Sequence, residues 1–350
     1  MKKNAESKIA IIGHFGADRD LLDGQTVKTK ILYQELTAAT GWQIRTVDTY
    51  YKSTRPLRLL AQTVSCLLRS RDIFVLLSGN GMRFYFPLLS FCARVFHTRV
   101  YHDVIGGSLD RYVERYPRFR RYLNSFRVNW VETEGLKSRL EAIGIRNCEV
   151  LPNFKRLSIA AVPKASFCEP YRFCTFSRVM KEKGIEDAVS AVEEINREAG
   201  WTVCTLDIYG SVDASYRARF ERVLADASSA IHYGGLVPYD RSVRAIQNYD
   251  ALLFPTRWDG EGFPGTIVDA FSAGLPVIAS DWGCNGEIIR HKQNGLLYPN
   301  AEMPELKDAI QWLLRHPADV FTMREACLRD ARLYQPDLYI QKIITKLESR

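Results

Sequence analysis

The sequence contains no apolar run long enough to cross a membrane. Stretches such as FVLLS (74–78) and ALLFP (251–255) have the length of strands, whereas a membrane-spanning helix needs about 20 mostly apolar residues. The N-terminal stretch MKKNAESKIAIIG also lacks the long apolar segment and cleavage site of a signal peptide. We therefore expect a cytoplasmic protein.

Paired cysteines are missing as well. The eight cysteines are scattered without a CxxC pair, and most have apolar neighbours, which is typical of reduced core thiols rather than of disulfides or zinc ligands. His and Cys residues form no cluster with metal-ligand spacing. The chain also has no internal repeat and no low-complexity tract. We expect neither a metal nor a cofactor.

Charge is plentiful, but it is distributed unevenly. Residues 1–165 hold 27 Lys and Arg against 14 Asp and Glu, a net charge of +13, within a chain of net charge +8. Residues 166–350 hold 21 basic residues against 26 acidic ones, a net charge of −5. A basic half predicts contact with something anionic, for which nucleic acid, an anionic membrane surface and a phosphorylated substrate are all candidates.

Strand-like and helix-like stretches alternate along the 350 residues, which are too many for one ordinary core. The first half begins with the strand-like KIAIIGHFG (8–16), and the second half restarts the rhythm at RFCTFSRV (172–179). Such alternation is typical of parallel sheets that are covered by helices on both faces. The sequence therefore predicts an α/β protein with two doubly wound, Rossmann-like domains. We expect these domains to face each other across a cleft at the carboxyl ends of their strands.

The domain junction is expected in RLSIAAVPKASFCEPYR (156–172), which breaks this rhythm and contains two prolines. The expected domains are residues 1–165 and residues 166–335. A C-terminal helix over residues 336–350 is expected to pack back on the first domain.

The stretch DGEGFPGTIVDAFSAGLPVIASD (259–281) places a glutamate, two glycines and a proline directly before a helix. A glycine-rich loop that leads into a helix N-terminus leaves several backbone N–H groups free beside the positive end of the helix dipole. Such a place suits a phosphate, or the hydroxyls of a group attached to one. An ordinary strand–loop–helix connection also uses glycine and proline, so this stretch by itself leaves both interpretations open.

A second candidate site lies at the start of the second half. Arg178 and Lys183 bracket a loop in SRVMKEKGIEDA, and Gly184 leads into the next helix. Two cations five residues apart at a strand end can bind both phosphates of a diphosphate. A solvated loop whose cations face water is the alternative.

Taken together, these patterns resemble the retaining glycosyltransferases of family 4. Arg178 followed by Lys183-Gly184, and Glu261-Gly262-Phe263-Pro264 with an acid eight residues after Glu261, carry the resemblance. Further stretches follow the order and spacing of that family: DIYG (207–210), YGGLVP (233–238), LLFPT (252–256), AGLPVIASD (273–281) and NGLLYP (294–299). In the first half, GQTVKTK, YHDVIGGSL and VLPNFK look like its capsular and exopolysaccharide branch.

The resemblance covers roughly residues 8–300 and implies the GT-B fold. It also implies a hexosyltransferase that moves a sugar from a nucleotide-diphosphate-sugar donor to a saccharide acceptor, with retention at the anomeric carbon. Members that build polymers often use lipid-linked acceptors, so we expect one here. No DxD motif lies between two strands as in the metal-dependent sugar transferases of the other common fold, so we expect transfer without a metal.

The resemblance assigns charged side chains to the donor. Arg178 and Lys183 match the pair that binds the diphosphate and neutralises the leaving nucleotide. Glu261 matches the first acid of the paired-acid motif, a catalytic residue that faces the donor sugar. Asp269 takes the place of the second acid, usually Glu, which hydrogen-bonds the ribose hydroxyls. An Asp is one methylene shorter, so this position departs from the family pattern.

Between these two acids, the resemblance assigns donor contacts to the loop and the helix start. The loop whose backbone approaches the sugar hydroxyls matches Phe263, Pro264 and Gly265. The point where the helix N-terminus meets phosphate matches Thr266 and Ile267.

In the first domain, Gly24 and Gln25 match the loop that approaches the donor phosphates across the cleft. His102 and Asp103 end a strand near the place where family members often have a His or an acid beside the acceptor, and Glu132 is similarly placed. Because neighbouring residues of a strand point to opposite faces, the side chains of His102 and Asp103 diverge. A structural histidine is the alternative for the former.

The basic stretch RYVERYPRFRRYLNSFR (111–127) has six arginines, five aromatics and one acid, Glu114. This composition is compatible with single-stranded nucleic acid, with an interfacial membrane helix or with a solvated basic face. No recognised nucleic-acid module accompanies it, and RPLRLLAQTVSCLLRSR (55–71) has a similar character. Because members of the family that build polymers often use lipid-linked acceptors, the resemblance favours the membrane surface. We expect peripheral docking on the inner face of the cytoplasmic membrane, and no nucleic acid. The expected docking residues are the interleaved aromatics together with Arg111, Arg115, Arg118, Arg120 and Arg121.

A GT-B sugar-nucleotide epimerase shares the fold and is the alternative enzyme class. The paired-acid motif argues against it.

Overall fold

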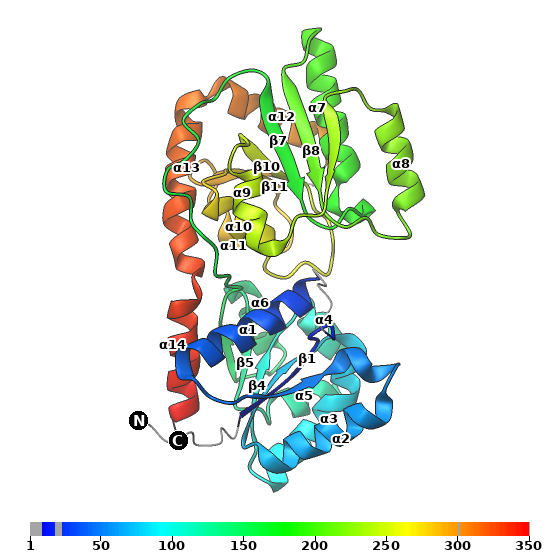
Figure 1. Cartoon of the computed structure of the whole chain (residues 1–350), viewed down its shortest axis with the longest axis vertical. Helices are drawn as coiled ribbons and strands as arrows, with labels where there is room; N and C mark the ends of the chain where they lie inside the picture. Colours follow the sequence, from blue (N-terminus) through cyan, green and yellow to red (C-terminus); the bar gives the residue numbers. More distant parts are fainter. Residues whose placement is uncertain (1–8, 18–22, 300–301, 350) are drawn as a thin grey trace. The chain divides into compact units, whose positions relative to one another are not determined.

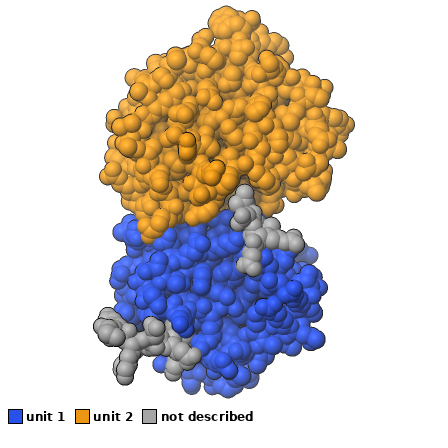
Figure 2. Space-filling view, in the orientation of Figure 1, with its two compact units in different colours: residues 1–154, 336–350 blue, residues 155–335 orange. Residues whose placement is uncertain are grey.

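The computed structural model describes residues 9–17, 23–299 and 302–349. The chain divides into two compact units, one of residues Met1–Phe154 with Pro336–Arg350 and one of Lys155–Gln335 (Figures 1 and 2). Each unit is built on a six-stranded sheet in which every pairing between neighbouring strands is parallel. The expectation of an α/β protein with two doubly wound sheets is confirmed.

The first unit has strands and helices in alternation. Its strands are β1 (Ile9–Gly13), β2 (Arg45–Asp48), β3 (Asp72–Leu76), β4 (Arg99–Asp103), β5 (Val128–Val131) and β6 (Cys148–Val150). Its helices are α1 (Gly24–Thr40), the 3-10 turn η1 (Thr49–Lys52), α2 (Pro56–Arg69), α3 (Gly79–Val95), α4 (Leu109–Arg115), α5 (Arg118–Leu123), α6 (Glu134–Ala142) and α14 (Pro336–Glu348).

The strand order in the first unit is β2-β1-β3-β4-β5-β6. The chain runs outward from β1 to β2, then crosses back over β1 to β3 and continues in the opposite direction. The topological switch point therefore lies between β1 and β3, and the carboxyl edge of the sheet beside such a point is where open α/β sheets bind ligands. All five residues of β1 and of β3 are buried, as expected for strands that are covered on both faces.

Different layers cover the two faces of this sheet. Ile73 and Val75 of β3 pack with apolar side chains of the layer that contains α2, α3, α5 and α6. Phe74 alternates to the other face, where its ring stacks on Tyr101 and Trp130 with centroids 5.1 and 5.8 Å away. These three aromatic residues of the first sheet thus fill core space.

Helix α14, at the C-terminal end of the described chain, belongs to this first unit. The ring of Tyr339 stacks on Phe154 with centroids 5.5 Å apart. The ammonium of Lys342 donates a hydrogen bond of 2.8 Å to the carbonyl of Val150. The helix is therefore attached to the end of β6 and the segment after it.

The second unit repeats the alternation. Its strands are β7 (Tyr171–Phe176), β8 (Cys204–Tyr209), β9 (Ile231–Gly235), β10 (Ala251–Phe254), β11 (Val277–Ser280) and β12 (Gly295–Tyr298). Its longer helices are α7 (Ile185–Ala199), α8 (Arg217–Asp226), α10 (Gly265–Ser272), α12 (Met303–Arg315) and α13 (Pro317–Ala331), and its short ones are η2 (Lys181–Lys183), η3 (Tyr239–Arg241), α9 (Ser242–Ile246), α11 (Asn285–Ile288) and η4 (Arg332–Tyr334).

The strand order in the second unit is β12-β11-β10-β7-β8-β9. The chain runs from β7 through β8 to β9, returns to β10 on the other side of β7, and continues to β12. Strands β7 and β10 therefore flank the switch point of this sheet. Two hydrophobic clusters cover its two faces, one with α7 and α12 and one with α10 and α13.

The junction between the units lies at Phe154–Lys155, before the segment 156–172 in which the sequence predicts it. Hydrogen bonds explain the difference, because they attach the start of that segment to the second unit. The backbone N–H of Lys155 donates to Tyr334, and that of Ala160 donates to Ser272, at 3.1 and 2.8 Å.

Cys168 is exposed and the other seven cysteines are buried, all of them as free thiols. In the described ranges, no helix is long and apolar enough to cross a membrane.

Candidate functional site

The charged side chains assigned to the donor gather at the switch point of the second sheet. Arg178 and Lys183 follow the carboxyl end of β7, and Glu261 follows that of the neighbouring strand β10. Open α/β sheets bind their ligands at such a point, outside the carboxyl ends of the strands. The fold thus brings Lys183 and Glu261, which are 78 positions apart in the sequence, into contact.

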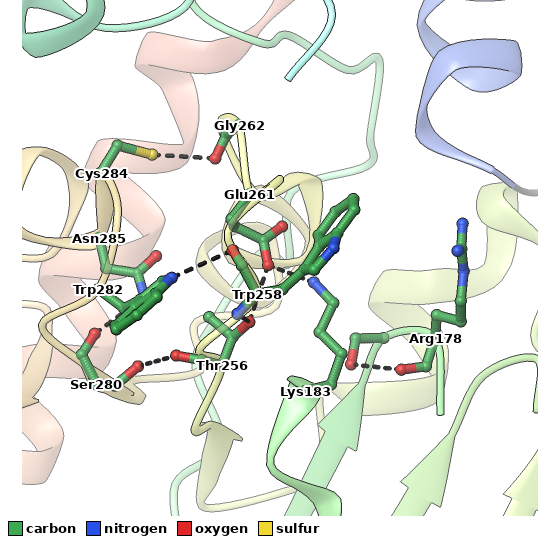
Figure 3. A network of polar contacts seen from close by, with 11 residues as sticks. Arg178, Lys183, Thr256, Trp258, Glu261, Gly262, Ser280, Trp282, Cys284 and Asn285 are labelled. Carbon is green, nitrogen blue, oxygen red and sulfur yellow. Dashed lines mark hydrogen bonds and ion pairs between the residues drawn. The ribbon is translucent and has the colours of Figure 1, made fainter. Parts of the chain in front are cut away.

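Lys183 is buried and forms an ion pair with Glu261 through its ammonium (Figure 3). The ammonium also lies over two aromatic rings, 5.0 Å from the centroid of Trp258 and 5.2 Å from that of Phe254. Burial lowers the pKa of Lys183, and the charge of Arg178 lowers it further, while Glu261 raises it. The site therefore holds a cation that burial disfavours and that one carboxylate and two ring faces stabilise.

Glu261 is held from a second side by Thr256, which directly follows Pro255 at the end of β10. The hydroxyl of Thr256 donates a hydrogen bond of 3.0 Å to Glu261 Oε2, the same oxygen that pairs with Lys183 (Figure 3). Thr256 is itself fully buried, and its carbonyl accepts a hydrogen bond of 2.5 Å from the hydroxyl of Ser280. The end of β11 thereby supports the position of Glu261.

The turn that carries Lys183 needs a glycine next to it. Gly184 has a φ of +67° and ends η2, and a Cβ at this position would overlap the carbonyl oxygen of Pro255. The left-handed conformation and the close approach both exclude a side chain. Gly184 therefore lets the loop after β7 lie directly against the end of β10.

The loop between β10 and α10 is pinned by side chains that follow β11. The indole N–H of Trp282 donates to the carbonyl of Trp258 at 3.2 Å (Figure 3). The thiol of Cys284 lies 3.1 Å from the carbonyl of Gly262, to which it donates. Since these contacts involve the backbone of the loop, they fix the path of the chain on both sides of Glu261.

Helix α10 begins at Gly265 after Pro264. Its N-terminus has no side-chain cap among the described residues. Phe263 is buried with its ring 5.2 Å from that of Tyr334, so it anchors the loop in the core of its own unit. The N–H of Ile267 donates to the carbonyl of Pro264 at 3.0 Å. The hydroxyl oxygen of Thr266 is buried and has no hydrogen-bond partner within the described chain. An uncapped helix start of this kind attracts anions.

Asp269 is buried on α10 and has partners on both of its oxygens. Its Oδ2 pairs with the ammonium of Lys155 at 2.6 Å, and its Oδ1 accepts from the hydroxyl of Ser242 at 2.7 Å. A ribose contact at this carboxylate would have to share an oxygen with one of these partners. That role stays a prediction.

In the first unit, Gly24 is exposed and begins α1, with Asp23 as its N-cap. The amide of Gln25 donates a hydrogen bond of 3.0 Å to the carbonyl of Leu76 and accepts one of 3.0 Å from Ser78. The start of α1 is thus joined to the end of β3, at the switch point of this sheet. The proposed contact of Gly24 and Gln25 with donor phosphates stays a prediction.

A buried charge cluster lies at the carboxyl edge of the first sheet. Lys28 of α1 pairs with Asp103 at 2.6 Å and with Glu132 at 2.9 Å, and it donates to the carbonyl of Val104 at 3.0 Å. Burial opposes the charge of Lys28, but the two carboxylates outweigh it and raise the pKa of its ammonium. Burial raises the pKa of Asp103 to about 6 although Lys28 lowers it. Two acids therefore share one cation.

His102 points to the other face of β4, as expected for a neighbour of Asp103 in a strand. Its ring is fully buried between Phe86 and Phe126, and its Nδ1 lies 3.0 Å from the amide oxygen of Asn129. Burial lowers its pKa to about 4. The imidazole is therefore neutral at pH 7 and sits among core side chains.

Several residues of these sites have no individual signal in the sequence. Thr256 and Trp258 lie beside the paired-acid motif, but only the fold turns them toward Glu261 and Lys183. Lys155 is 114 positions from Asp269, and no local pattern predicts that pair. Lys28 could have been found from its place in GQTVKTK, one helical turn after Gly24 and Gln25.

No group of three or more His, Cys, Asp and Glu side chains that could hold a metal ion occurs among residues 9–17, 23–299 and 302–349.

Comparisons with known proteins give a family for part of the chain and relatives for the fold. Residues 170–316 match the protein family described as Glycosyl transferases group 1. A similar curated protein is the amylovoran biosynthesis glycosyltransferase AmsK of Erwinia amylovora, 27% identical over 156 residues that cover 43% of this chain and 38% of that protein. The chain spans less than half the length of the first curated relatives that it matches.

Solved structures match nearly the whole chain. One is Alr3699/HepE of Anabaena in complex with UDP and glucose, with a TM-score of 0.72 and 14% identity over 99% of this chain and 100% of that one. Another is the sucrose-phosphate synthase tll1590 of Thermosynechococcus elongatus, with a TM-score of 0.76 and 17% identity over 97% and 98% of the two chains. Residues 170–316 thus match the glycosyl transferases group 1 family, and the chain has the two-domain GT-B fold.

Proposed function

We propose that this protein is a retaining glycosyltransferase of family 4, which moves a hexose from a nucleotide-diphosphate sugar to a saccharide acceptor without a metal. The observation that carries this proposal is the buried contact of Lys183 with Glu261 at the switch point of the second sheet. A diphosphate needs fixed cations, and a sugar needs an acceptor of hydrogen bonds within a few ångströms of them. This pair supplies both groups at one place.

Each side chain takes one role in the proposed reaction. Arg178, which is exposed at the end of β7, and Lys183 bind the diphosphate and neutralise the charge that develops on it as the glycosidic bond breaks. The N–H groups at the start of α10 face the same phosphates. Glu261 hydrogen-bonds the hydroxyls of the donor sugar once the diphosphate has taken over Lys183.

The acceptor is proposed to bind the first unit at the carboxyl edge of its sheet. Of the two adjacent candidates, we favour Asp103, because it belongs to the charge cluster at that edge, whereas His102 is packed between phenylalanines. A carboxyl group whose pKa is near 6 can accept a proton from a hydroxyl at neutral pH.

We further propose that the acceptor is lipid-linked and that the enzyme serves surface or exopolysaccharide synthesis, in the capsular and exopolysaccharide branch of the family. A relative named for the biosynthesis of amylovoran, the glycosyltransferase AmsK, supports a biosynthetic role. The enzyme would then work in the cytoplasm on the inner face of the membrane. The exposed arginines of α4 and α5, beginning with Arg111 and ending with Arg121, would face the anionic headgroups.

The test of the donor site is a thermal-shift screen of purified protein against a panel of nucleotide sugars and nucleoside diphosphates. A ligand at 100 times its dissociation constant adds about 2.7 kcal/mol of stability, so the true donor should raise Tm clearly above the others. Product analysis with the donor alone and with saccharide acceptors then separates transfer from epimerisation. Absence of a shift with every compound in the panel would contradict the proposed donor site.

A further inference from the structure

Large apolar side chains are exposed mainly on two neighbouring helices of the first unit. Eight of the fourteen such side chains in the described part of the chain lie on α2 or α3 or directly after α3. On α2 they recur every three or four residues and so share one helix face, and Leu57 and Leu68 at its two ends are 82% and 79% exposed. We call this set the α2–α3 apolar surface: Leu57, Leu60, Val64, Leu68, Phe84, Phe91, Val95 and Phe96.

The opposite faces of both helices are firmly packed. The hydroxyls of Thr63 on α2 and Tyr85 on α3 are buried and lie 3.0 Å apart, which joins the two helices. Cys66 and Phe86 are buried in the core beneath them. The exposed side chains therefore belong to rigid helices whose other faces are already covered.

The basic side chains on these helices and beside them are arginines, apart from one exposed histidine, His97, which follows α3. Residues 55–71 and 79–97 contain no Asp or Glu, and they hold Arg55, Arg58, Arg69, Arg71, Arg83 and Arg94. Arg83 donates to the hydroxyl of Tyr112 on α4 at 3.2 Å, and Arg94 donates to the carbonyl of Arg121 on α5 at 2.9 Å. The apolar surface is thus continuous with the basic surface of α4 and α5.

The helices α4 and α5 do not themselves offer an apolar face. Phe119 is fully buried, and Tyr112, Tyr116 and Tyr122 pack against the core of the unit. The aromatics that the sequence suggests for membrane contact in 111–127 are therefore buried or half-buried, whereas all six arginines of that stretch are exposed. Apart from Leu338 on α14, the large exposed apolar side chains in the described part of this unit lie on α2, on α3 or directly after α3.

We propose that the α2–α3 apolar surface inserts into the headgroup region of an anionic lipid bilayer, while the surrounding arginines bind the lipid phosphates. This proposal extends the proposed function, and it rests on the premise that the acceptor is lipid-linked. Apolar helix faces rimmed by Arg are the composition that lies in a membrane interface. A two-fold dimer would instead bring the arginines of two copies together, without a single acid on these helices to pair with them. A nucleic acid offers no aliphatic surface that could cover the leucine and valine side chains exposed on α2.

Such docking has two components that respond differently to salt. The attraction of arginines to anionic headgroups is screened, because the Debye length falls from about 10 Å at 0.1 M to about 3 Å at 1 M. The insertion of leucine and phenylalanine is not weakened by salt. At low protein concentration, the protein should therefore bind only vesicles that contain anionic lipid. Part of this binding, the part that comes from apolar insertion, should persist in high salt.

The experiment is co-sedimentation of the full chain with vesicles of phosphatidylcholine alone or with 30% phosphatidylglycerol, at about 0.1 M and about 1 M NaCl. The test variant is L57S/L68S, and the matched control is L236S/L338S, which removes two leucines that are 58% and 61% exposed elsewhere. Because all four side chains are exposed, neither variant should unfold the protein, and circular dichroism checks this. The thermal shift given by a nucleoside diphosphate reports separately on the donor site.

We expect L57S/L68S to bind anionic vesicles at least about tenfold more weakly than the wild type and to lose the salt-resistant part, with the control unchanged. Equal binding of the two variants would overturn the proposal, as would a concentration-dependent dimer in lipid-free buffer that L57S/L68S abolishes. Loss of vesicle binding with an intact nucleotide shift is the result expected of L57S/L68S. A wild type that binds no vesicles but keeps the nucleotide shift refutes the membrane surface and leaves the donor site standing.

Discussion

Replacing Glu261 by Gln should destabilise the free protein and leave its affinity for nucleoside diphosphate intact or higher. The side chains of Lys183 and Glu261 are each 8% exposed, so the substitution leaves a buried ammonium whose carboxylate partner is gone. Breaking a buried ion pair by removing one partner costs about 3–5 kcal/mol. A loss of about 3 kcal/mol lowers the Tm of a unit of this size by about 6–12 °C.

The diphosphate of a donor should reverse this loss, because it brings negative charge to the same ammonium. In the wild type, the diphosphate has to displace Glu261 from Lys183, whereas in E261Q the cation is already unpaired. We expect the variant to bind the diphosphate as tightly as the wild type or up to about fivefold tighter, a difference of about 1 kcal/mol. Sugar transfer should nevertheless be lost, because the proposed partner of Glu261 is the sugar.

The assay is a double-mutant cycle of wild type, E261Q, K183M and K183M/E261Q, followed by thermal unfolding and titration calorimetry with the diphosphate that gives the largest shift. The double variant removes both charges from the buried position, so its stability should recover most of the loss of E261Q. E186Q is the matched control, since Glu186 pairs with Arg219 at a half-exposed position where an ion pair contributes at most about 1 kcal/mol. A coupling energy near zero, or a diphosphate that stabilises E261Q less than the wild type, would refute this account of the site.

Three further results are expected. R178A and K183A should each weaken diphosphate binding by about 1.5–3 kcal/mol in titration calorimetry, and unchanged affinity in both would remove the cations from the site. Transfer should persist in excess EDTA, and an inhibition that magnesium reverses would show that a metal takes part. Burial raises the pKa of Asp103 from 3.8 to about 6, so the folded protein binds more protons than the unfolded chain between these values and loses stability as the pH rises through them. Compared with D103N, the wild type should therefore lose about 2 kcal/mol of unfolding free energy between pH 4 and pH 6 in denaturant titrations, and parallel curves would contradict the raised pKa.

The pattern along the chain was enough to predict the α/β class, because strands buried on both faces must be continuous apolar runs. Strands β1 and β3 follow this rule, since each has five consecutive buried residues. The loop before α10 could be found for a similar reason, since glycine and proline mark a turn whatever surrounds it. Local chemistry of this kind needs no knowledge of the fold.

Long-range contacts decided the rest. The sequence places Lys183 and Glu261 in separate loops, and only the switch point between β7 and β10 brings the ammonium and the carboxylate together. Composition likewise does not show whether a side chain packs against the core or faces the solvent. Phe119 lies in the most basic stretch of the chain and is buried, whereas Leu57 lies in a similar stretch and is exposed, because only the first helix face meets a neighbour that covers it.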